Sequence, residues 1–411
     1  MTRSQINYNG HKAIGTVAIV VPAISREGIT KQVAVQITGL QRERISVCLI
    51  VLARSNISLL KEYGVNSSQI PVLQLHQATA YLSPGAFANS LNIAWPILTF
   101  LREQHAESVI AHAPYAHFVT RLVKLSGAFA NRRFTLIQYF HGLQYSEYPI
   151  VTLKRRLVNN LNKWLASRYD NIHVSVSEVV KQEITVNLLH HPEHVVIYNT
   201  LVKSKHQSEA AADAWQQVQL MLQQSDKKYK ILIPNRIDYN KGQLFFLNVL
   251  NAFLRTGVAS ATDLAVFIVG DGPQKAEVEQ MVQVNGLASI VTLTGVLPNS
   301  TILKLMEQVQ LVVVPSFKEG LPFAVLEALE AGCVVLASDT GGIPEIIRHQ
   351  ETGFLFEPGN LQSCLEQLTY IYQNRNKRLI NIKVALQDLQ GKFSNEKNIE
   401  KLLHLLPAKK P

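Results

Sequence analysis

The sequence predicts an α/β protein with two parallel β-sheets. Short β-branched runs alternate with longer amphipathic segments along most of the chain, a pattern typical of strands that are each followed by a helix. The alternation stops once, in a polar stretch at residues 203–228 that is rich in Gln and Ala, and then starts again. A chain of 411 residues is long enough for two domains that each bury a core.

Six strands are expected before the break, each a short apolar run. They are Thr16–Pro22, Ile45–Leu52, Val109–His112, Phe134–Gln138, His173–Val176 and Val195–Tyr198. Together they predict that residues 1–202 form one Rossmann-like domain.

The break at 203–228 is expected to be a linker with one solvent-facing helix. Five more strands follow it, at Ile231–Pro234, Ala265–Val269, Ile290–Leu293, Leu311–Pro315 and Val334–Ser338. They predict a second Rossmann-like domain at 229–378. Two such domains leave a cleft between the carboxyl ends of their strands, where open α/β sheets bind ligands. Residues 379–411 have helical periodicity, and we expect a helical tail that can pack back on the first domain.

Charge is distributed unevenly along the chain. The net charge is +10, and residues 1–200 hold 19 Lys and Arg against 10 Asp and Glu, hence 19 − 10 = +9. Such an excess indicates an anionic surface or polymer as partner, or serves only solubility. Nucleic acid is disfavoured, because aromatic residues are not interleaved with the basic clusters.

The cysteines and the chain start indicate a cytoplasmic protein. Cys48, Cys333 and Cys364 are scattered, and their spacing suggests neither a disulfide framework nor a zinc site. The polar residues Met1–Lys12 do not resemble a signal peptide, and no apolar run reaches the roughly 20 residues that span a bilayer.

The most informative segment follows the strand Leu311–Pro315. It reads as a glycine-containing loop and then a helix, so the backbone amides of Gly320, Leu321 and Phe323 are expected near a helix start, where phosphate binds well. Glu327 lies about one turn into that helix and can accept hydrogen bonds from a ribose diol. Glu319, in the loop, can bind sugar hydroxyls or stabilise positive charge at an anomeric carbon. Either glutamate alone reads more readily as a surface carboxylate, but the two together, after a strand and on either side of a glycine, indicate a binding site.

This segment, Pro315–Leu329, resembles the donor-binding signature of the retaining GT-B glycosyltransferases that have two glutamates with seven residues between them (glycosyl transferases group 1, family 4). Glu319 and Glu327 match that spacing. The resemblance implies a GT-B fold, with two Rossmann-like domains facing each other across a cleft. It also implies that Glu327 binds the nucleotide ribose and Glu319 contacts the donor sugar.

Further segments of the second domain resemble the same family in order. Pro234–Gly242 is similar to its Gly-Arg-Leu…Lys-Gly stretch, which assigns the donor diphosphate to Arg236 and Lys241, although Asn235 replaces the usual Gly. Val269–Pro273, Thr294–Val296 and Gly341–Ile346 also match. The chain has no Asp-x-Asp motif for a divalent metal. We therefore expect no metal or other cofactor, with side-chain cations and helix amides neutralising the leaving diphosphate.

The first domain resembles the family less closely. Tyr139–Gly142 is similar to its His-Gly, which assigns His141 to the donor sugar near the reacting centre. Gly28 is the plausible equivalent of a Gly-Gly turn beside the diphosphate. His112 and Ser177–Glu178 also resemble positions of the family, and for these residues a structural role is favoured.

The segment Leu153–Arg168 is a basic amphipathic helix by its spacing. Leu153, Leu157, Leu161, Trp164 and Leu165 fall on one side and cations elsewhere. It reads first as a domain helix with a solvated basic face, and second as a helix that docks on anionic lipid headgroups.

The sequence therefore predicts a transferase that moves a hexose or N-acetylhexosamine from a nucleoside-diphosphate sugar to a glycan, lipid-linked or polymer acceptor. The resemblance implies retention of configuration by a front-face mechanism and a place in cell-surface polysaccharide or glycoconjugate synthesis. A peripheral contact with the inner face of an anionic membrane fits the charge. Two alternatives stay open: a nucleotide-sugar 2-epimerase or phosphorylase on the same architecture, and a non-catalytic partner subunit.

Overall fold

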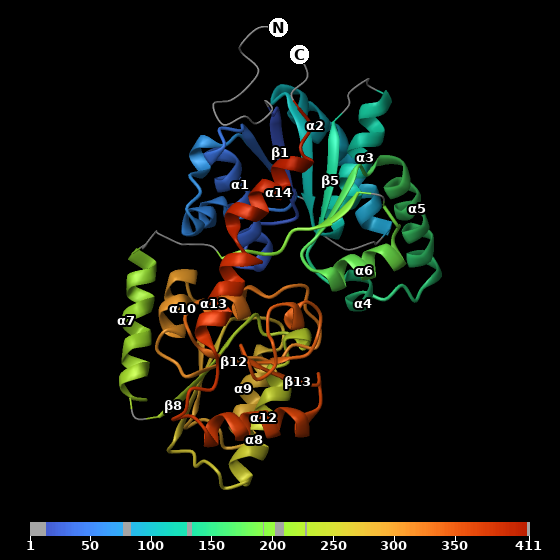
Figure 1. The fold of residues 1–411 in the computed structure, drawn as a ribbon. Coiled ribbons are helices and arrows are strands. Elements are labelled where there is room, and N and C mark those ends of the chain that lie inside the picture. The colour runs from blue at the N-terminus through green and yellow to red at the C-terminus, as the bar shows by residue number, and fades with distance from the viewer. Residues whose placement is uncertain are drawn as a thin grey trace. The chain divides into compact units, whose positions relative to one another are not determined.

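The computed structural model describes residues 14–76, 84–129, 134–191, 193–201, 209–226 and 228–408. The chain divides into two compact units. The first is Met1–Val202 together with Asn395–Pro411, and the second is Lys203–Ser394. Each unit is an α/β structure built on a parallel sheet, as Figure 1 shows, which confirms the predicted fold class.

The sheet of the first unit has the strand order β3-β2-β1-β4-β5-β6-β7. Its strands are parallel, and the order reverses between β1 and β4. The strands are β1 (Thr16–Val21), β2 (Val47–Val51), β3 (Val72–Gln74), β4 (Ala106–His112), β5 (Thr135–Phe140), β6 (Ile172–Ser175) and β7 (His194–Val196).

Helices connect these strands. Helices α2 and α3 share a buried core with one side of the sheet, and α1 packs against α14. The helices are α1 (Gly28–Arg42), α2 (Pro84–Glu103), α3 (Pro114–Phe129), α4 (Gln144–Glu147), α5 (Leu153–Tyr169), α6 (Glu178–Asn187) and α14 (Asn395–Leu405), with 3-10 helices η1 (Ile57–Tyr63) and η2 (Ser67–Gln69).

The sheet of the second unit has the strand order β10-β9-β8-β11-β12-β13, which reverses between β8 and β11. Again all strands are parallel. They are β8 (Tyr229–Pro234), β9 (Leu264–Val269), β10 (Val291–Gly295), β11 (Leu311–Val314), β12 (Val334–Ser338) and β13 (Phe354–Phe356).

The helices of the second unit enclose one large hydrophobic core, to which α8, α9 and α12 contribute. The helices are α7 (Glu209–Gln223), α8 (Gln243–Arg255), α9 (Lys275–Val284), α10 (Asn299–Met306), α11 (Phe323–Glu330), α12 (Leu361–Gln373) and α13 (Ile382–Gly391), with 3-10 helices η3 (Tyr239–Lys241) and η4 (Ile343–Glu345). Helix α7 lies in the segment predicted as a linker, and it packs on α10, where the Thr301 hydroxyl donates to the carbonyl of Ala211 over 3.2 Å. The segment predicted as a helical tail gives α13 to the second unit and α14 to the first.

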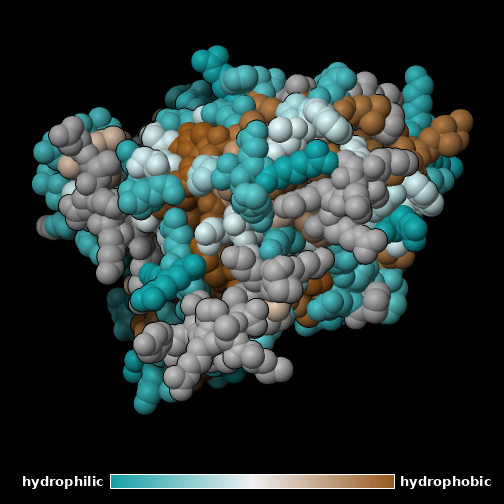
Figure 2. Space-filling view, turned by 90° about the horizontal axis from the view of Figure 1, so that it is seen from above, coloured by the Kyte–Doolittle hydropathy of each residue, from teal (hydrophilic) through white to brown (hydrophobic). Residues whose placement is uncertain are grey.

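The surface and the helices differ from those of a membrane-spanning protein in the part of the chain that the structure describes. Figure 2 shows one face on which hydrophilic side chains dominate and apolar ones form separate groups. Among the helices that the structure describes, none has the length and apolar character needed to cross a membrane.

Candidate functional site

The candidate donor site lies where the strand order of the second sheet reverses. Strands β8 and β11 are neighbours there and run in parallel, so the loops after their carboxyl ends lie side by side. The loop after β8 carries Arg236 and Lys241, and the loop after β11 carries Glu319. Topology therefore brings Glu319 beside Lys241, which is 78 positions away in the sequence, at the edge where such sheets bind ligands.

Lys241 and Glu319 form a close ion pair. The Lys241 ammonium donates to Oε1 of Glu319 over 2.6 Å, and the Ser316 hydroxyl donates to the same oxygen over 2.8 Å. The glutamate is buried, whereas a quarter of the lysine side chain is exposed. A paired ammonium at the sheet edge is thus held in place and still reaches solvent, which suits a cation that meets a ligand phosphate.

The Glu319 loop is fixed by a very close backbone approach. Gly341 has φ +55°, and a Cβ atom there would lie 1.8 Å from the carbonyl oxygen of Glu319. Beside it, the amide of Gly342 donates to the carbonyl of Gly320 over 2.9 Å. Only glycine permits both the positive φ and this distance, so the predicted Gly-Gly-x-Pro-Glu segment shapes the loop that carries Glu319.

Arg236 lies in the same segment after β8, five residues before Lys241. Its Nε is 3.6 Å from Oδ2 of Asp238, and half of the side chain is exposed. The backbone carbonyl of Arg236 accepts a hydrogen bond of 2.8 Å from the Gln243 side chain. Asn235, which replaces the family's glycine, is not among the residues with positive φ, so this turn does not require glycine.

Helix α11 follows the loop and contains the second glutamate. Leu321 and Phe323 are buried at its start, and the residue before the helix is Pro322, which gives no side-chain cap. Glu327 is the fifth helical residue and is 4% exposed. Glu327 is thus a buried carboxylate about one turn from the helix start, and its contact with a ribose stays a prediction.

In the first unit, the predicted residues lie after neighbouring strands. Gly28 is the first residue of α1, which follows β1, and His141 comes directly after β5. His112 ends β4, between β1 and β5 in the sheet. The carboxyl ends of parallel strands meet at one edge, which explains why the two histidines are close together.

His112 and His141 form a hydrogen-bonded chain with Gln36 of α1. Nδ1 of His112 lies 2.7 Å from Nε2 of His141, and Nε2 of His112 lies 2.9 Å from Oε1 of Gln36. The glutamine oxygen accepts, so Nε2 of a neutral His112 carries its proton and Nδ1 accepts from His141. This leaves Nδ1 of His141 as its hydrogen-bond acceptor.

Burial keeps both histidine rings neutral. It lowers the pKa of His112 well below its usual value, with the neighbouring His141 as a further cause, and it lowers the pKa of His141 to about 3. A neutral imidazole at this edge can accept a hydrogen bond from a sugar hydroxyl but cannot serve as a cation for a phosphate. Sequence reasoning favoured a structural role for His112 and did not identify Gln36.

Comparison with known proteins relates the second unit to one family. Residues 221–386 match the family model of glycosyl transferases group 1. The sulfoquinovosyl transferase SQD2 of Arabidopsis thaliana is 31% identical over 140 residues, which are 33% of this chain and 27% of that protein. The uncharacterized glycosyltransferase MJ1607 of Methanocaldococcus jannaschii is 26% identical over 231 residues, 56% of this chain and 58% of that protein. The matches thus span less than two thirds of these relatives.

A solved structure resembles nearly the whole chain. The Anabaena Alr3699/HepE structure in complex with UDP-glucose has a TM-score of 0.74 and 18% identity, covering 95% of this chain and 100% of that one. At this identity the likeness concerns the fold. The chain therefore has the α/β architecture of GT-B glycosyltransferases, and its second unit carries the sequence pattern of the group 1 family.

Proposed function

We propose that this protein is a retaining glycosyltransferase that moves a hexose or N-acetylhexosamine from a nucleoside-diphosphate sugar to a glycan, lipid-linked or polymer acceptor without a divalent metal. The observation that carries the proposal is the Lys241–Glu319 pair at the reversal point of the second sheet, within the segment that matches the family. The names of the relatives support the reaction class, and the HepE complexes with UDP and UDP-glucose support the donor class.

The proposed roles follow from the charge that develops during transfer. The departing diphosphate gains negative charge, which Lys241, Arg236 and the amides of the Gly320 loop would stabilise. Glu319 would hold donor-sugar hydroxyls and keep the Lys241 ammonium in place. Glu327 would accept hydrogen bonds from the ribose diol.

The acceptor proton also needs a destination. In a front-face mechanism the bond from the anomeric carbon to the phosphate oxygen breaks as the acceptor oxygen bonds to the same face. The acceptor proton then passes to the departing phosphate oxygen, so no protein nucleophile is required. In the first unit, Nδ1 of the neutral His141 would accept from a donor-sugar hydroxyl, and Gly28 would allow a close backbone approach to the diphosphate.

A donor-consumption assay tests the proposal. The protein is incubated in EDTA with a panel of UDP-, GDP-, ADP- and TDP-sugars, with and without mixed glycan acceptors, and the released diphosphate is measured. We expect release from one donor, and a product whose anomeric configuration in NMR spectra equals that of the donor. Lys241→Ala should lower the rate about tenfold to a hundredfold, because a charged hydrogen bond contributes about 1.5–3 kcal/mol.

The matched control is Lys275→Ala. Lys275 also lies in a loop-to-helix segment of the second unit, with its Nζ 3.7 Å from Oδ2 of Asp271. This substitution should leave the rate unchanged. If the donor is isomerised and no sugar is transferred, the protein is an epimerase and the proposal is wrong. Failure to consume or bind any donor would replace it by a non-catalytic partner subunit.

A further inference from the structure

Helix α5 of the first unit presents its apolar side to solvent. Leu153, Leu157 and Trp164, spaced four and seven residues apart, are 73%, 62% and 55% exposed. Tyr148 and Val151, just before the helix, are exposed as well, so this segment contains five of the 14 exposed large apolar side chains in the part of the chain that the structure describes. We call these five residues the α5 ridge. Soluble helices normally bury such a stripe.

The sequence pattern favoured a helix packed on the domain by this side, and that orientation is wrong for most of the stripe. The side that faces α3 instead includes Asn159, Asn162, Leu165 and Ala166, all buried. In Figure 1, α5 lies on the outer side of α3. Two questions follow: which contact within the domain turns the apolar ridge toward solvent, and what the ridge binds.

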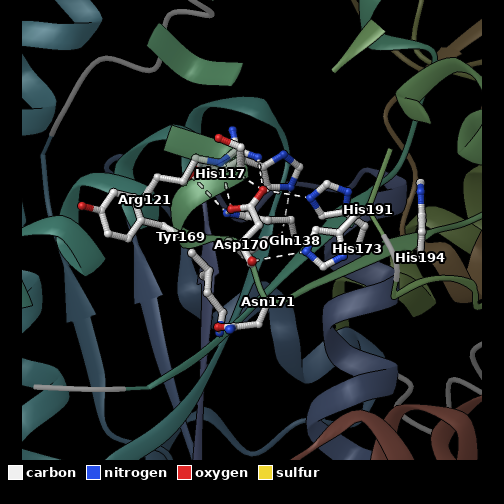
Figure 3. Close-up of polar contacts among 12 residues, drawn as sticks. His117, Arg121, Gln138, Tyr169, Asp170, Asn171, His173, His191 and His194 are labelled. Atoms are coloured by element: carbon white, nitrogen blue, oxygen red, sulfur yellow. Dashed lines mark hydrogen bonds and ion pairs between the residues drawn. The ribbon is translucent and has the colours of Figure 1, made fainter. Parts of the chain in front are cut away.

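The cause is a buried arginine of α3. Arg121 is 1% exposed, and it donates to the Asp170 carboxylate over 2.6 and 2.9 Å and to Oδ1 of Asn162 over 2.5 Å. Figure 3 shows Asp170 between Arg121 and His173, whose ring nitrogen lies 2.9 Å from the same carboxylate. A buried guanidinium left without these partners would be costly, so Asn162 must face inward. That fixes the rotation of α5 and turns the ridge to solvent.

The sequence that contains the ridge is basic. From Ser108 to Asp170 it holds nine Lys and Arg and two acidic residues, Glu147 and Asp170. Its net charge is 9 − 2 = +7, and one of the nine cations, Arg121, is the buried partner of Asp170. Five of the cations lie on α5, and α3, on which it packs, contains no Asp or Glu.

The cations of α5 border the apolar ridge on both sides. At about 100° per residue, Arg156 and Lys163 lie on one side of it and Lys154 and Arg168 on the other. Long basic side chains beside exposed Leu and Trp are the arrangement by which interfacial helices lie in the headgroup region of a bilayer. A protein partner of opposite charge would not need the apolar ridge to be flanked in this way on both sides.

We propose that helix α5 docks in the plane of an anionic lipid bilayer, with the α5 ridge among the upper acyl chains and its cations on the headgroup phosphates. This inference goes beyond the sugar-transfer proposal and does not depend on it. Each cation near an anionic surface contributes about 1 kcal/mol, roughly a fivefold factor in binding. The apolar contacts add to this and give the orientation.

Vesicle sedimentation of the full-length protein tests the proposal. Vesicles of phosphatidylcholine with an equal part of phosphatidylglycerol should bind the protein, and vesicles of phosphatidylcholine alone should bind it at least tenfold more weakly. Replacing Leu153, Leu157 and Trp164 together by serine should lower binding at least tenfold. The matched control replaces three equally exposed apolar residues on other helices, Val186, Leu220 and Val284, and should bind as the wild type does.

Tryptophan fluorescence at the ridge distinguishes docking of α5 from electrostatic attraction of the whole protein to the vesicle. With Trp95 and Trp215 replaced by phenylalanine, Trp164 is the sole tryptophan, and its emission should shift to shorter wavelength with the anionic vesicles. Equal binding by the ridge and control variants, or an unshifted Trp164 emission on bound protein, would overturn the proposal. So would a vesicle-free dimer that becomes a monomer in the ridge variant, since a second copy would then cover this face.

Discussion

Mild acid is expected to destabilise the first unit much more than the second. Eleven of the 13 histidines belong to the first unit. Burial lowers the pKa of His194 to about 3, with the positive charges of nearby histidines and Lys181 as further causes. It lowers the pKa of His112 and His117 well below the usual 6.5. These rings stay neutral in the folded protein but bind protons once the chain unfolds.

The sign and size follow from proton linkage. A group whose pKa is lowered by folding contributes its full stability above its unfolded pKa of 6.5, and this contribution falls as the pH drops below that value. The loss is about 1.4 kcal/mol per pH unit and per ring, so about 2 kcal/mol per ring at about pH 5. His141 and His194, whose pKa values folding lowers to about 3, together lose about 4 kcal/mol, and His112 and His117 add to the loss in the same direction. This loss is comparable with the whole stability of a typical domain of about 5–15 kcal/mol.

Asp170 does not offset this loss. Arg121 and His173 hold the pKa of its carboxyl below its usual 3.8, against the opposing effect of burial, so its contribution is present above that pH and is lost only in stronger acid. Its charge also favours the protonated form of His173, whose pKa is lowered by burial. We therefore leave His173 out of the sum above.

Urea titrations at about pH 7 and about pH 5, followed by hydrogen exchange of peptides from each unit, measure the effect. With a slope of about 2–3 kcal/mol per molar urea, the midpoint of the first unit should fall by about 2 M or more. The second unit should shift far less. His194→Gln, whose amide reaches the position of Nε2 and keeps a partner for the Ser175 hydroxyl, should remove about 2 kcal/mol of the pH-dependent loss. Equal shifts in both units would refute the reasoning.

Two further predictions concern single contacts. Gly341→Ala places a Cβ on the Glu319 carbonyl and should weaken nucleoside-diphosphate binding at least tenfold in calorimetry. The control, Gly286→Ala, has φ +66° but open space around it, so it should lose only about 1 kcal/mol of stability and bind the diphosphate normally. Normal binding by the Gly341 variant would contradict the role of that close approach. Arg121→Met should lower the unfolding free energy by about 3–5 kcal/mol because it leaves the buried Asp170 carboxylate without its guanidinium partner. Adding Asp170→Asn should recover part of the loss in thermal unfolding, and no recovery would show that pairing is not the cause.

The sequence predicted the sheets better than their edges. Strands such as β1 and β12 were expected almost residue for residue, because they are apolar runs of five or more residues. The edge strands β3 and β13, of three residues each, were missed because so short a run gives little periodic signal, although the equally short edge strand β7 was expected at Val195–Tyr198. Each of them joins its sheet only through tertiary pairing with one neighbour.

The candidate site was predicted to the extent that topology determines it. Lys241 and Glu319 were both expected after strands, and the neighbouring positions of β8 and β11 explain their ion pair. Gln36 was missed because a polar residue inside a helix usually faces solvent. Its signal was the pair Gln32 and Gln36, four residues apart in an otherwise apolar stretch, and both are buried.

The orientation of α5 shows a limit of periodicity arguments. The helical spacing of the apolar residues identified an apolar side of α5. It could not show that a buried arginine on another helix requires the opposite side of α5 to face the domain. Arg121 and Asn162 are 41 residues apart, and their contact exists only in the folded domain.

The most direct test of the account is nucleoside-diphosphate binding in EDTA, measured by thermal stabilisation and calorimetry on the wild type, Glu327→Ala and Lys241→Ala. We expect one diphosphate to bind the wild type, and both variants to bind it about tenfold or more weakly, since each removes a charged group assigned to the donor. Lys275→Ala should bind as the wild type does. Absence of binding by every diphosphate, or equal binding by all four proteins, would contradict the assignment of the donor site to the second unit.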